Sequence, residues 1–284
     1  MQENVSSNVV LDSLYGVSLS RGGLVLASSY LRNSNDNYIV ANGKKFIHRL
    51  PASKVMWCGE GIFASTSTSL RIWRASLDKP MYKLASSKSA GQAITSFDWQ
   101  GARIATCSID TTIVIWNIER GKMETRMIAH DKAVFDVSFA PNPNLFASVS
   151  DDGSLRMFDM RDLDHSTIVY EGSAPMLRLA WNMQSNSIAT IGSDSKTICL
   201  FDMRKVGFGL KTVSTNACPN AISWSNDHGL ISGLADGSIV VINNTAMQSK
   251  KIASFPQPCV NIAVENNSVA AVHGSAVSVI SAAN

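Results

Sequence analysis

The tetrapeptide Phe-Asp-Met-Arg occurs twice in this chain of 284 residues, and the repetition constrains the fold more than any other feature of the sequence. The copies begin at Phe158 and Phe201, roughly 40 residues apart, which is a typical period of repeat proteins. Similar segments, each ending in a large apolar residue, recur at about the same interval. Including a degenerate first copy, the anchors are Val40, Trp73, Trp116, Phe158, Phe201, Ile242 and Ile280. The sequence therefore predicts seven structural repeats.

Each repeat has the pattern of antiparallel strands. A strand of small residues and a Gly/Asp/Asn turn precede each anchor, and an alternating strand comes earlier still, as in VFDVSF, FASVSDDGS and LRMFD. Helical periodicity is almost absent. Three clear strands and a weaker fourth per repeat are typical of a WD40 blade, so we expect an all-β, seven-bladed WD40 β-propeller. The expected single domain, 1–284, has blades at about 12–50, 51–90, 91–130, 131–173, 174–217, 218–257, and 258–284 with 1–11.

The last repeat stops just after its third strand. The leftover segment 5–11 precedes the first strand of the first repeat, and it would supply the missing outer strand. This pairing of the N- and C-terminal strands would close the propeller and remove an unpaired strand edge.

Composition excludes several classes of function. The net charge is +3, from 25 basic and 22 acidic residues spread along the chain, so we expect no direct nucleic-acid binding. The five cysteines are odd in number and lack a C-x-x-C motif, which disfavours disulfides and zinc. No leader or uninterrupted apolar span is recognisable, so we expect no membrane association and a cytoplasmic and nuclear location.

The sequence offers no constellation for catalysis. The aspartates that recur in the turn before each third strand are structural, because a short carboxylate there accepts backbone N–H groups; these are Asp110, Asp152, Asp194 and Asp236. Asp164, His165 and Ser166 are neighbours in sequence, whereas a triad is assembled from distant segments. Inner-strand positions read as small or apolar. We therefore expect no enzyme activity, no cofactor and no metal site.

His130 lies where WD40 repeats often place the histidine of a buried His-Ser-Asp-Trp hydrogen-bond network. Asp152 and a strand serine are available to it, but the anchor Phe158 has no N–H to donate. The third repeat has Trp116 and Asp110 without a matching histidine. We interpret His130 as a structural residue of an incomplete network.

Residues 93 to 171 resemble one group of WD40 proteins closely. The motifs SIDTT, IAHDK, DGSLRMFDMR and LDHSTI are similar to those of the plant adaptors of the TRANSPARENT TESTA GLABRA and anthocyanin-regulator type. The animal relative of that group is a cullin-4-associated factor that scaffolds DYRK-type and homeodomain-interacting kinases. The resemblance implies a non-enzymatic protein–protein interaction scaffold whose partners are such kinases, transcription factors and a cullin-4 ligase adaptor.

The repeated tetrapeptide has two interpretations. In cullin-4 substrate receptors, paired W/F-D-x-R boxes dock on the ligase adaptor, so the resemblance implies adaptor docking by Asp159, Arg161, Asp202 and Arg204. Arginine suits this role because its rigid fork binds carboxylates or carbonyls bidentately. In the alternative, Arg161 and Arg204 pair only with their own aspartates or neighbouring turns.

The top face of the propeller is the second candidate surface. From the repeat register, we expect Phe135, Ile109 and Leu177 to form an apolar patch there, with Asp151 beside it. In the alternative, these apolar side chains pack under loops. We predict a scaffold for a regulatory kinase or a transcription factor, with a cullin-4 substrate receptor as one form of this function; the alternative is a structural subunit of a chromatin or RNA-processing assembly.

Overall fold

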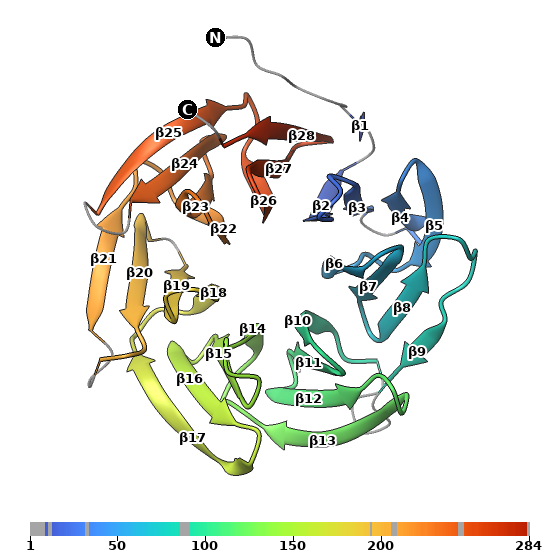
Figure 1. Ribbon diagram of the computed structural model, residues 1–284, viewed down its shortest axis with the longest axis horizontal. Coiled ribbons are helices and arrows are strands. Elements are labelled where there is room, and N and C mark those ends of the chain that lie inside the picture. Colours follow the sequence, from blue (N-terminus) through green and yellow to red (C-terminus); the bar gives the residue numbers. More distant parts are fainter. Residues whose placement is uncertain are drawn as a thin grey trace. The chain divides into compact units, whose positions relative to one another are not determined.

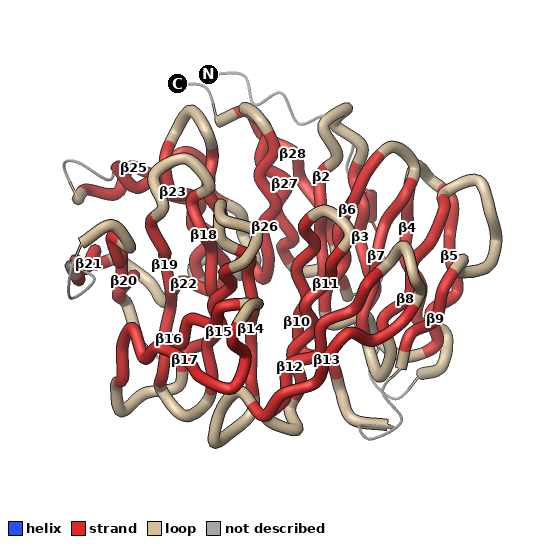
Figure 2. Tube along the Cα trace, turned by 60° about the horizontal axis from the view of Figure 1, so that its bottom comes forward, coloured by secondary structure: helices blue, strands red, loops and turns tan. Residues whose placement is uncertain are grey.

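A computed structural model describes residues 9–10, 13–31, 34–85, 91–193, 195–205, 209–243 and 247–282. In these ranges the chain forms 28 strands, arranged in seven antiparallel sheets of four strands each. Figure 2 shows only strands and loops in the described parts, which therefore contain no helix that could span a membrane. The prediction of an all-β seven-bladed propeller is confirmed.

The seven sheets are called blades 1 to 7 in chain order, and their strands are labelled in Figure 1. Blade 1 contains β2 (Leu14–Leu19), β3 (Val25–Ser29), β4 (Asn37–Ala41) and β5 (Lys44–Arg49), and blade 2 contains β6 (Lys54–Gly59), β7 (Ile62–Thr66), β8 (Leu70–Arg74) and β9 (Tyr82–Leu84). Blade 3 contains β10 (Ile94–Gln100), β11 (Arg103–Ser108), β12 (Thr112–Asn117) and β13 (Lys122–Ile128).

Blade 4 contains β14 (Val134–Phe139), β15 (Leu145–Ser150), β16 (Ser154–Asp159) and β17 (Asp162–Glu171), and blade 5 contains β18 (Met176–Asn182), β19 (Ser187–Gly192), β20 (Thr197–Asp202) and β21 (Leu210–Ser214). Blade 6 contains β22 (Pro219–Ser225), β23 (Gly229–Leu234), β24 (Ser238–Asn243) and β25 (Gln248–Ser254). Blade 7 contains β26 (Cys259–Glu265), β27 (Ser268–His273), β28 (Ala276–Ser281) and β1 (Val9–Val10).

The chain divides into two compact units. One consists of Met1–Ser67, Arg71–Met81 and Val213–Asn284, and the other of Thr68–Leu70 and Tyr82–Thr212. The first therefore holds blades 6, 7 and 1 and most of blade 2, and the second holds blades 3 and 4, most of blade 5 and the strand β9 of blade 2.

The N-terminal strand completes blade 7. β1 pairs with β28 in antiparallel fashion, with Val9 opposite Val277 and Val10 opposite Ala276. The predicted pairing of the N- and C-terminal strands is therefore confirmed. Without β1, strand β28 would form the edge of the sheet and could pair with another chain. β1 covers part of that edge.

Apolar residues of successive blades share each core cluster. In the second unit, Phe139, Phe146 and Phe158 of blade 4 pack with Ile113 and Ile115 of blade 3. The repeated anchor Phe201 of blade 5 lies in the next cluster, together with apolar residues of blade 4. In the first unit, similar clusters join blades 1 and 2, 6 and 7, and 7 and 1. Each blade therefore depends on its neighbour in the unit for burial of its apolar faces.

Two Asp-Gly turns need glycine. Gly153 and Gly237 both have φ near +81°, a left-handed conformation that side chains disfavour. A Cβ atom at Gly153 would also collide with the carbonyl oxygen of Gly172, and one at Gly237 with that of Phe255. Glycine thus allows the turn before the third strand to approach the end of the fourth strand.

Candidate protein-interaction site

The arginines of the repeated tetrapeptide lie in equivalent turns, at the end of blades 4 and 5 where the third strand leads to the fourth. This end is called the lower edge below. Arg161 Nη2 lies 2.6 Å from Asp159 Oδ2, and Arg161 Nε lies 2.9 Å from Asp159 Oδ1. In blade 5, Arg204 Nε lies 2.8 Å from Asp202 Oδ1, and Arg204 Nη2 lies 3.0 Å from Asp202 Oδ2. Each aspartate also accepts the backbone N–H of its arginine.

These pairs are exposed and geometrically fixed. The side chains of Arg161 and Arg204 are 71% and 63% exposed. Hydrogen bonds from the arginines lower the pKa of Asp159 and of Asp202 to about 2, so both carboxylates stay charged at neutral pH. A bidentate pair with its own aspartate holds each guanidinium in one orientation, with its remaining N–H groups directed away from that carboxylate. The structure thus contains the Asp–Arg pairing of the second interpretation, and it leaves adaptor docking as a proposal.

The second candidate surface lies at the opposite, upper edge of blades 3, 4 and 5. Backbone hydrogen bonds join the end of each second strand to the start of the first strand, with Asp151 N donating to Ala133 O at 2.9 Å and Ile109 N to Ala93 O at 3.2 Å. Ile109 is 45% exposed, whereas Phe135 and Leu177 are half-buried. Asp151 is partly exposed and lies 3.9 Å from Lys132 Nζ. The apolar surface of this edge is therefore largest at Ile109.

His130 is fully buried at the upper edge of blade 4. Its Nε2 lies 2.7 Å from Ser148 Oγ, and its Nδ1 lies 2.9 Å from Asp152 Oδ2. Burial lowers the pKa of His130, and Asp152 opposes that shift in part. Burial alone would raise the pKa of Asp152, but hydrogen bonds from Ser154 and the proximity of His130 lower it well below its usual range. These contacts are those of a structural network.

The other turn aspartates have local partners where the structure describes them. Asp110 accepts the backbone N–H and hydroxyl of Thr112 and forms an ion pair with Arg126 at 3.2 Å. Asp236 accepts the backbone N–H of Ser238 at 2.9 Å. Asp194 lies outside the described residues. In blade 3, Trp116 Nε1 donates to Thr106 Oγ1 at 2.9 Å, so this anchor is satisfied without a histidine.

A second histidine network, which joins His48 of β5 in blade 1 to blade 2, was not predicted from the sequence. His48 Nε2 lies 2.9 Å from Ser65 Oγ, and Trp73 Nε1 donates to the same oxygen at 2.9 Å. His48 Nδ1 lies 2.7 Å from the carbonyl oxygen of Leu50. The signal in the sequence is the order His-Ser-Trp, without an aspartate in the turn between β7 and β8.

The expectation that inner strands carry only small or apolar residues is wrong for blades 3 and 4. The nearly buried Asp136 of β14 accepts two hydrogen bonds from neighbouring blades. One comes from the hydroxyl of Ser96 in blade 3, at 2.6 Å, and the other from the backbone N–H of Leu179 in blade 5, at 3.0 Å. Asp98 of β10 accepts the backbone N–H of Phe139 at 2.7 Å from blade 4. Both carboxylates satisfy N–H groups at the inner edges of neighbouring sheets. Their role is to join blades.

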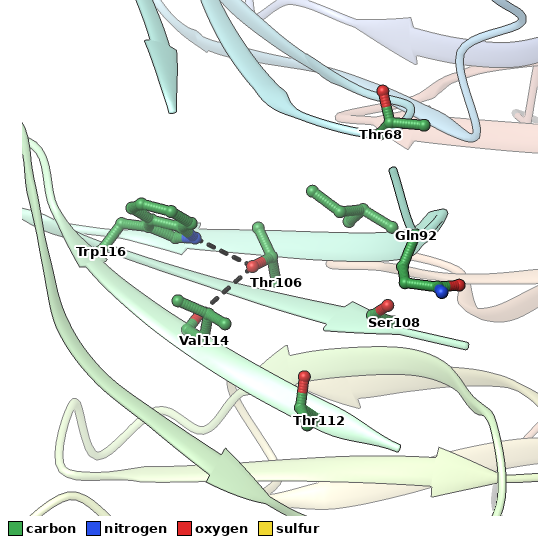
Figure 3. A pocket seen from close by; sticks show the side chains of 8 residues that line it. Thr68, Gln92, Thr106, Ser108, Thr112, Val114 and Trp116 are labelled. Atoms are coloured by element: carbon green, nitrogen blue, oxygen red, sulfur yellow. Dashed lines mark hydrogen bonds between the residues drawn. The ribbon is translucent and has the colours of Figure 1, made fainter. Parts of the chain in front are cut away.

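A small polar pocket lies at the upper edge of blade 3. Figure 3 shows the hydroxyl-bearing side chains of Thr106, Ser108 and Thr112 around it. Its volume is about 20 Å³, which is enough for about one water molecule. Thr106 occupies the position that Ser148 has in blade 4, where His130 fills the neighbouring space. The pocket is too small for an organic substrate or cofactor. The described residues also contain no group of three or more His, Cys, Asp or Glu side chains that could hold a metal ion.

The comparison with protein families agrees with the sheet pattern. The WD domain, G-beta repeat (WD40), matches residues 79–117 and 121–159. The second match begins just before the outer strand β13 of blade 3 and ends with β16 of blade 4, so one sequence repeat contributes to two sheets. This chain is a WD40-repeat protein.

Curated relatives of this WD40-repeat protein are similar over part of their length. A DDB1- and CUL4-associated factor 7 homolog of Dictyostelium discoideum is 41% identical over 213 residues, which are 69% of this chain and 65% of the relative. An uncharacterised WD repeat-containing protein of Schizosaccharomyces pombe is 36% identical over 215 residues, or 61% of this chain and 49% of the relative. A WD repeat-containing protein of Saccharomyces cerevisiae is 31% identical over 251 residues, or 67% and 48%.

The WD40-repeat protein thus spans between about half and two thirds of these relatives. WD40 propellers are typically platforms for binding other proteins. The two exposed Asp–Arg pairs and the upper edge around Ile109 are its candidate contact surfaces.

Proposed function

We propose that this WD40-repeat protein is a non-enzymatic scaffold that docks on a cullin-4 ubiquitin ligase adaptor through the lower edge of blades 4 and 5. The observation that carries the proposal is the repeated, exposed and bidentate Asp–Arg pair, formed by Asp159 with Arg161 and by Asp202 with Arg204. The 41% identity to a relative named for DDB1 and CUL4 supports the same assignment.

The paired geometry favours docking because it lowers the cost of ordering the arginines on binding. A free arginine side chain loses rotamer freedom in an interface, whereas Arg161 and Arg204 are already held by their aspartates. The N–H groups that face away from the carboxylates remain for acceptors of the adaptor. Blade 3 lacks this pair, because Asn117 and Glu119 stand at the positions of Asp159 and Arg161.

Binding to the purified adaptor DDB1, measured by biolayer interferometry, tests the proposal. Arg161→Ala combined with Arg204→Ala should weaken binding at least about ten-fold, because arginine anchors dominate such contacts. Arg103→Ala combined with Arg120→Ala removes two blade 3 arginines and should leave binding unchanged. If the first double variant binds as tightly as the wild type, adaptor docking by these residues is wrong.

We further propose that the upper edge of blades 3 to 5 holds the scaffolded partner, a DYRK-type kinase or a transcription factor, in the cytoplasm and nucleus. Ile109 is its exposed apolar centre, with Phe135, Leu177 and Asp151 around it. Affinity purification with Ile109→Asp, compared with the wild type, should lose the kinase and keep the ligase adaptor. Recovery of one stoichiometric chromatin or RNA-processing particle instead would contradict this function.

A further inference from the structure

The outer strand of blade 4, β17 (Asp162–Glu171), has features that neither docking surface uses. It contains the LDHSTI motif and follows β16 through the tight turn that carries Arg161. With ten residues it is longer than every other strand in the described part of the chain.

β17 is an open edge. The strand order of its sheet is β14-β15-β16-β17, and no other strand of the described residues pairs with its far side. An edge strand presents unpaired backbone N–H and C=O groups, which an extended segment of another chain can bind as an added strand. The backbone N–H and C=O groups on the outer side of β17 can therefore pair with an added strand.

The strand is exposed at its centre and anchored at both ends. All five residues from Asp164 to Ile168 are exposed, including Ile168 at 49%. Leu163 packs against the core between blades 3 and 4, and Val169 and Tyr170 pack against the core between blades 4 and 5. The Tyr170 ring lies 5.6 Å from that of Phe201. Packing at both ends holds the exposed centre in a strand conformation.

Charge separates β17 from the other outer strands. It carries Asp162, Asp164 and Glu171 and no lysine or arginine; its one other titratable basic residue, His165, lies 3.1 Å from Asp162. In contrast, each of the outer strands β5, β9, β13, β21 and β25 carries at least one lysine or arginine, and β1 has no charged residue. On a chain with net charge +3, this strand is an acidic stripe, so its electrostatic complement is basic.

We propose that the outer edge of β17 binds a basic, extended segment of a partner protein by strand addition. Backbone hydrogen bonds to β17 supply the alignment. The carboxylates of Asp162, Asp164 and Glu171 select lysine or arginine side chains, and Ile168 provides an apolar contact. The regular pairing of Ser166, Thr167 and Ile168 with β16, between two bulges, defines the section that the added strand uses.

Fluorescence anisotropy with a labelled peptide that alternates lysine and valine tests this assignment. The triple variant Asp162→Asn, Asp164→Asn and Glu171→Gln should weaken binding about ten-fold, because ion pairs at exposed sites are individually weak and only their sum is measurable. The matched control, Glu60→Gln, Glu119→Gln and Asp227→Asn, removes the same charge from exposed turns and should bind as the wild type does. The peptide should also slow hydrogen exchange within residues 162–171.

A peptide with N-methyl groups on all its amides, which leaves no backbone N–H donor on either edge, separates strand addition from attraction by charge alone. Loss of binding by this peptide supports strand addition, and unchanged binding overturns it. Equal weakening by both triple variants also overturns it. Sedimentation showing that the chain self-associates through β17, and that the β17 triple variant does not, assigns the edge to a second copy instead. The proposal does not rest on adaptor docking, so Arg161→Ala with Arg204→Ala should still bind the peptide.

Discussion

The histidine networks of blades 2 and 4 share a plan and differ in one partner. Both histidines are buried, and both place Nε2 against a serine hydroxyl of the second strand, Ser65 in blade 2 and Ser148 in blade 4. The Nδ1 atom of His48 faces the carbonyl oxygen of Leu50, whereas that of His130 faces the carboxylate of Asp152. The tryptophan anchor in blade 2 is a phenylalanine in blade 4.

This difference decides how each network responds to a proton. In blade 2, neutral His48 satisfies every group, because Nδ1–H donates to Leu50, Ser65 donates to Nε2, and Trp73 donates to Ser65. Burial lowers the pKa of His48 to about 4; the hydrogen bond to Leu50 opposes this shift in part, and Arg71 adds to it. In blade 4 the carboxylate of Asp152 compensates part of the same burial effect. A carboxylate partner thus keeps the pKa of the buried imidazole closer to its ordinary value, so the stability of that network changes less as the pH falls.

The largest effect is expected from removing the histidine that has the carboxylate. His130→Ala leaves a cavity and removes one hydrogen-bond partner of the nearly buried Asp152, so we expect a loss of about 3 kcal/mol in the free energy of unfolding. His48→Ala should cost less, about 2 kcal/mol. It leaves the uncharged carbonyl oxygen of Leu50, near the surface, without a partner, which costs less than removing a partner from a carboxylate. Urea denaturation at neutral pH measures both.

The exposed His165 provides the control. Its side chain is 83% exposed and its ring pairs with the exposed Asp162, so His165→Ala should leave the urea midpoint unchanged. If His48→Ala costs more than His130→Ala, the carboxylate is not what distinguishes the two networks.

The second effect is the pH dependence of stability. The pKa of His48 is lowered from 6.5 to about 4, so between these values the unfolded chain binds a proton that the folded chain does not. The contribution of neutral His48 to the free energy of unfolding is complete above pH 6.5 and is lost as the pH falls toward 4. Between about pH 7.5 and about pH 5, we expect His48 to account for a loss of about 2 kcal/mol.

His48→Gln should remove this part of the acid-side loss in urea denaturations at a series of pH values. Asp162 raises the pKa of the exposed His165, so that residue does not share the acid-side loss, and His165→Gln should retain it. His130→Gln should change the slope less than His48→Gln does. Parallel pH curves for the wild type and His48→Gln would contradict the assignment.

The sequence predicts the repeat and its strands because both depend on local patterns. Anchor spacing, period-two alternation and the turn aspartates each involve neighbouring residues, and the structure has the expected seven sheets with β1 beside β28. Asp110, Asp152 and Asp236 cap their turns because each bonds a residue two positions ahead.

What the sequence did not predict involves contacts between blades. Asp98 and Asp136 look like solvent-facing residues of alternating strands, yet they bind backbone N–H groups of the next blade. His48 was missed because its partner Ser65 belongs to the following blade and no aspartate marks the turn. The exposure of Phe135 and Leu177 depends on packing between neighbours, which period-two patterns do not encode.

A smaller effect is expected at the aromatic anchor of blade 2. Trp73→Phe removes the N–H bond to Ser65 and should cost about 1 kcal/mol, the net value of one buried hydrogen bond. The ring itself should be accommodated, since blade 4 has Phe158 stacked on Phe146 as Trp73 is stacked on Phe63.

Trp99→Phe is the matched control, because it removes an indole hydrogen bond to Gly101 at an exposed site. Thermal unfolding should show a smaller loss for Trp99→Phe than for Trp73→Phe. Equal losses would mean that ring volume, and not the bond to Ser65, stabilises blade 2.

The smallest effect is expected at the arginine that hydrogen-bonds the backbone next to each network histidine. Arg156 donates to the carbonyl of Ala129 at 3.2 Å and to Asp131 at 3.0 Å, whereas Arg71 donates to the carbonyl of His48 at 2.9 Å. Lysine cannot reproduce a forked contact, so Arg156→Lys should cost about 0.5 kcal/mol and Arg71→Lys less than that.

Salt separates the two arginine contacts. Asp131 is 82% exposed, so ions screen its pairing with Arg156, and the cost of Arg156→Lys should shrink as salt is raised. The cost of Arg71→Lys should stay constant, because a carbonyl carries no net charge. Thermal melts in low and high salt measure both costs. If the two costs depend on salt equally, the charged partner Asp131 is not what distinguishes the network of blade 4 from that of blade 2. The difference between the two networks would then come from burial alone.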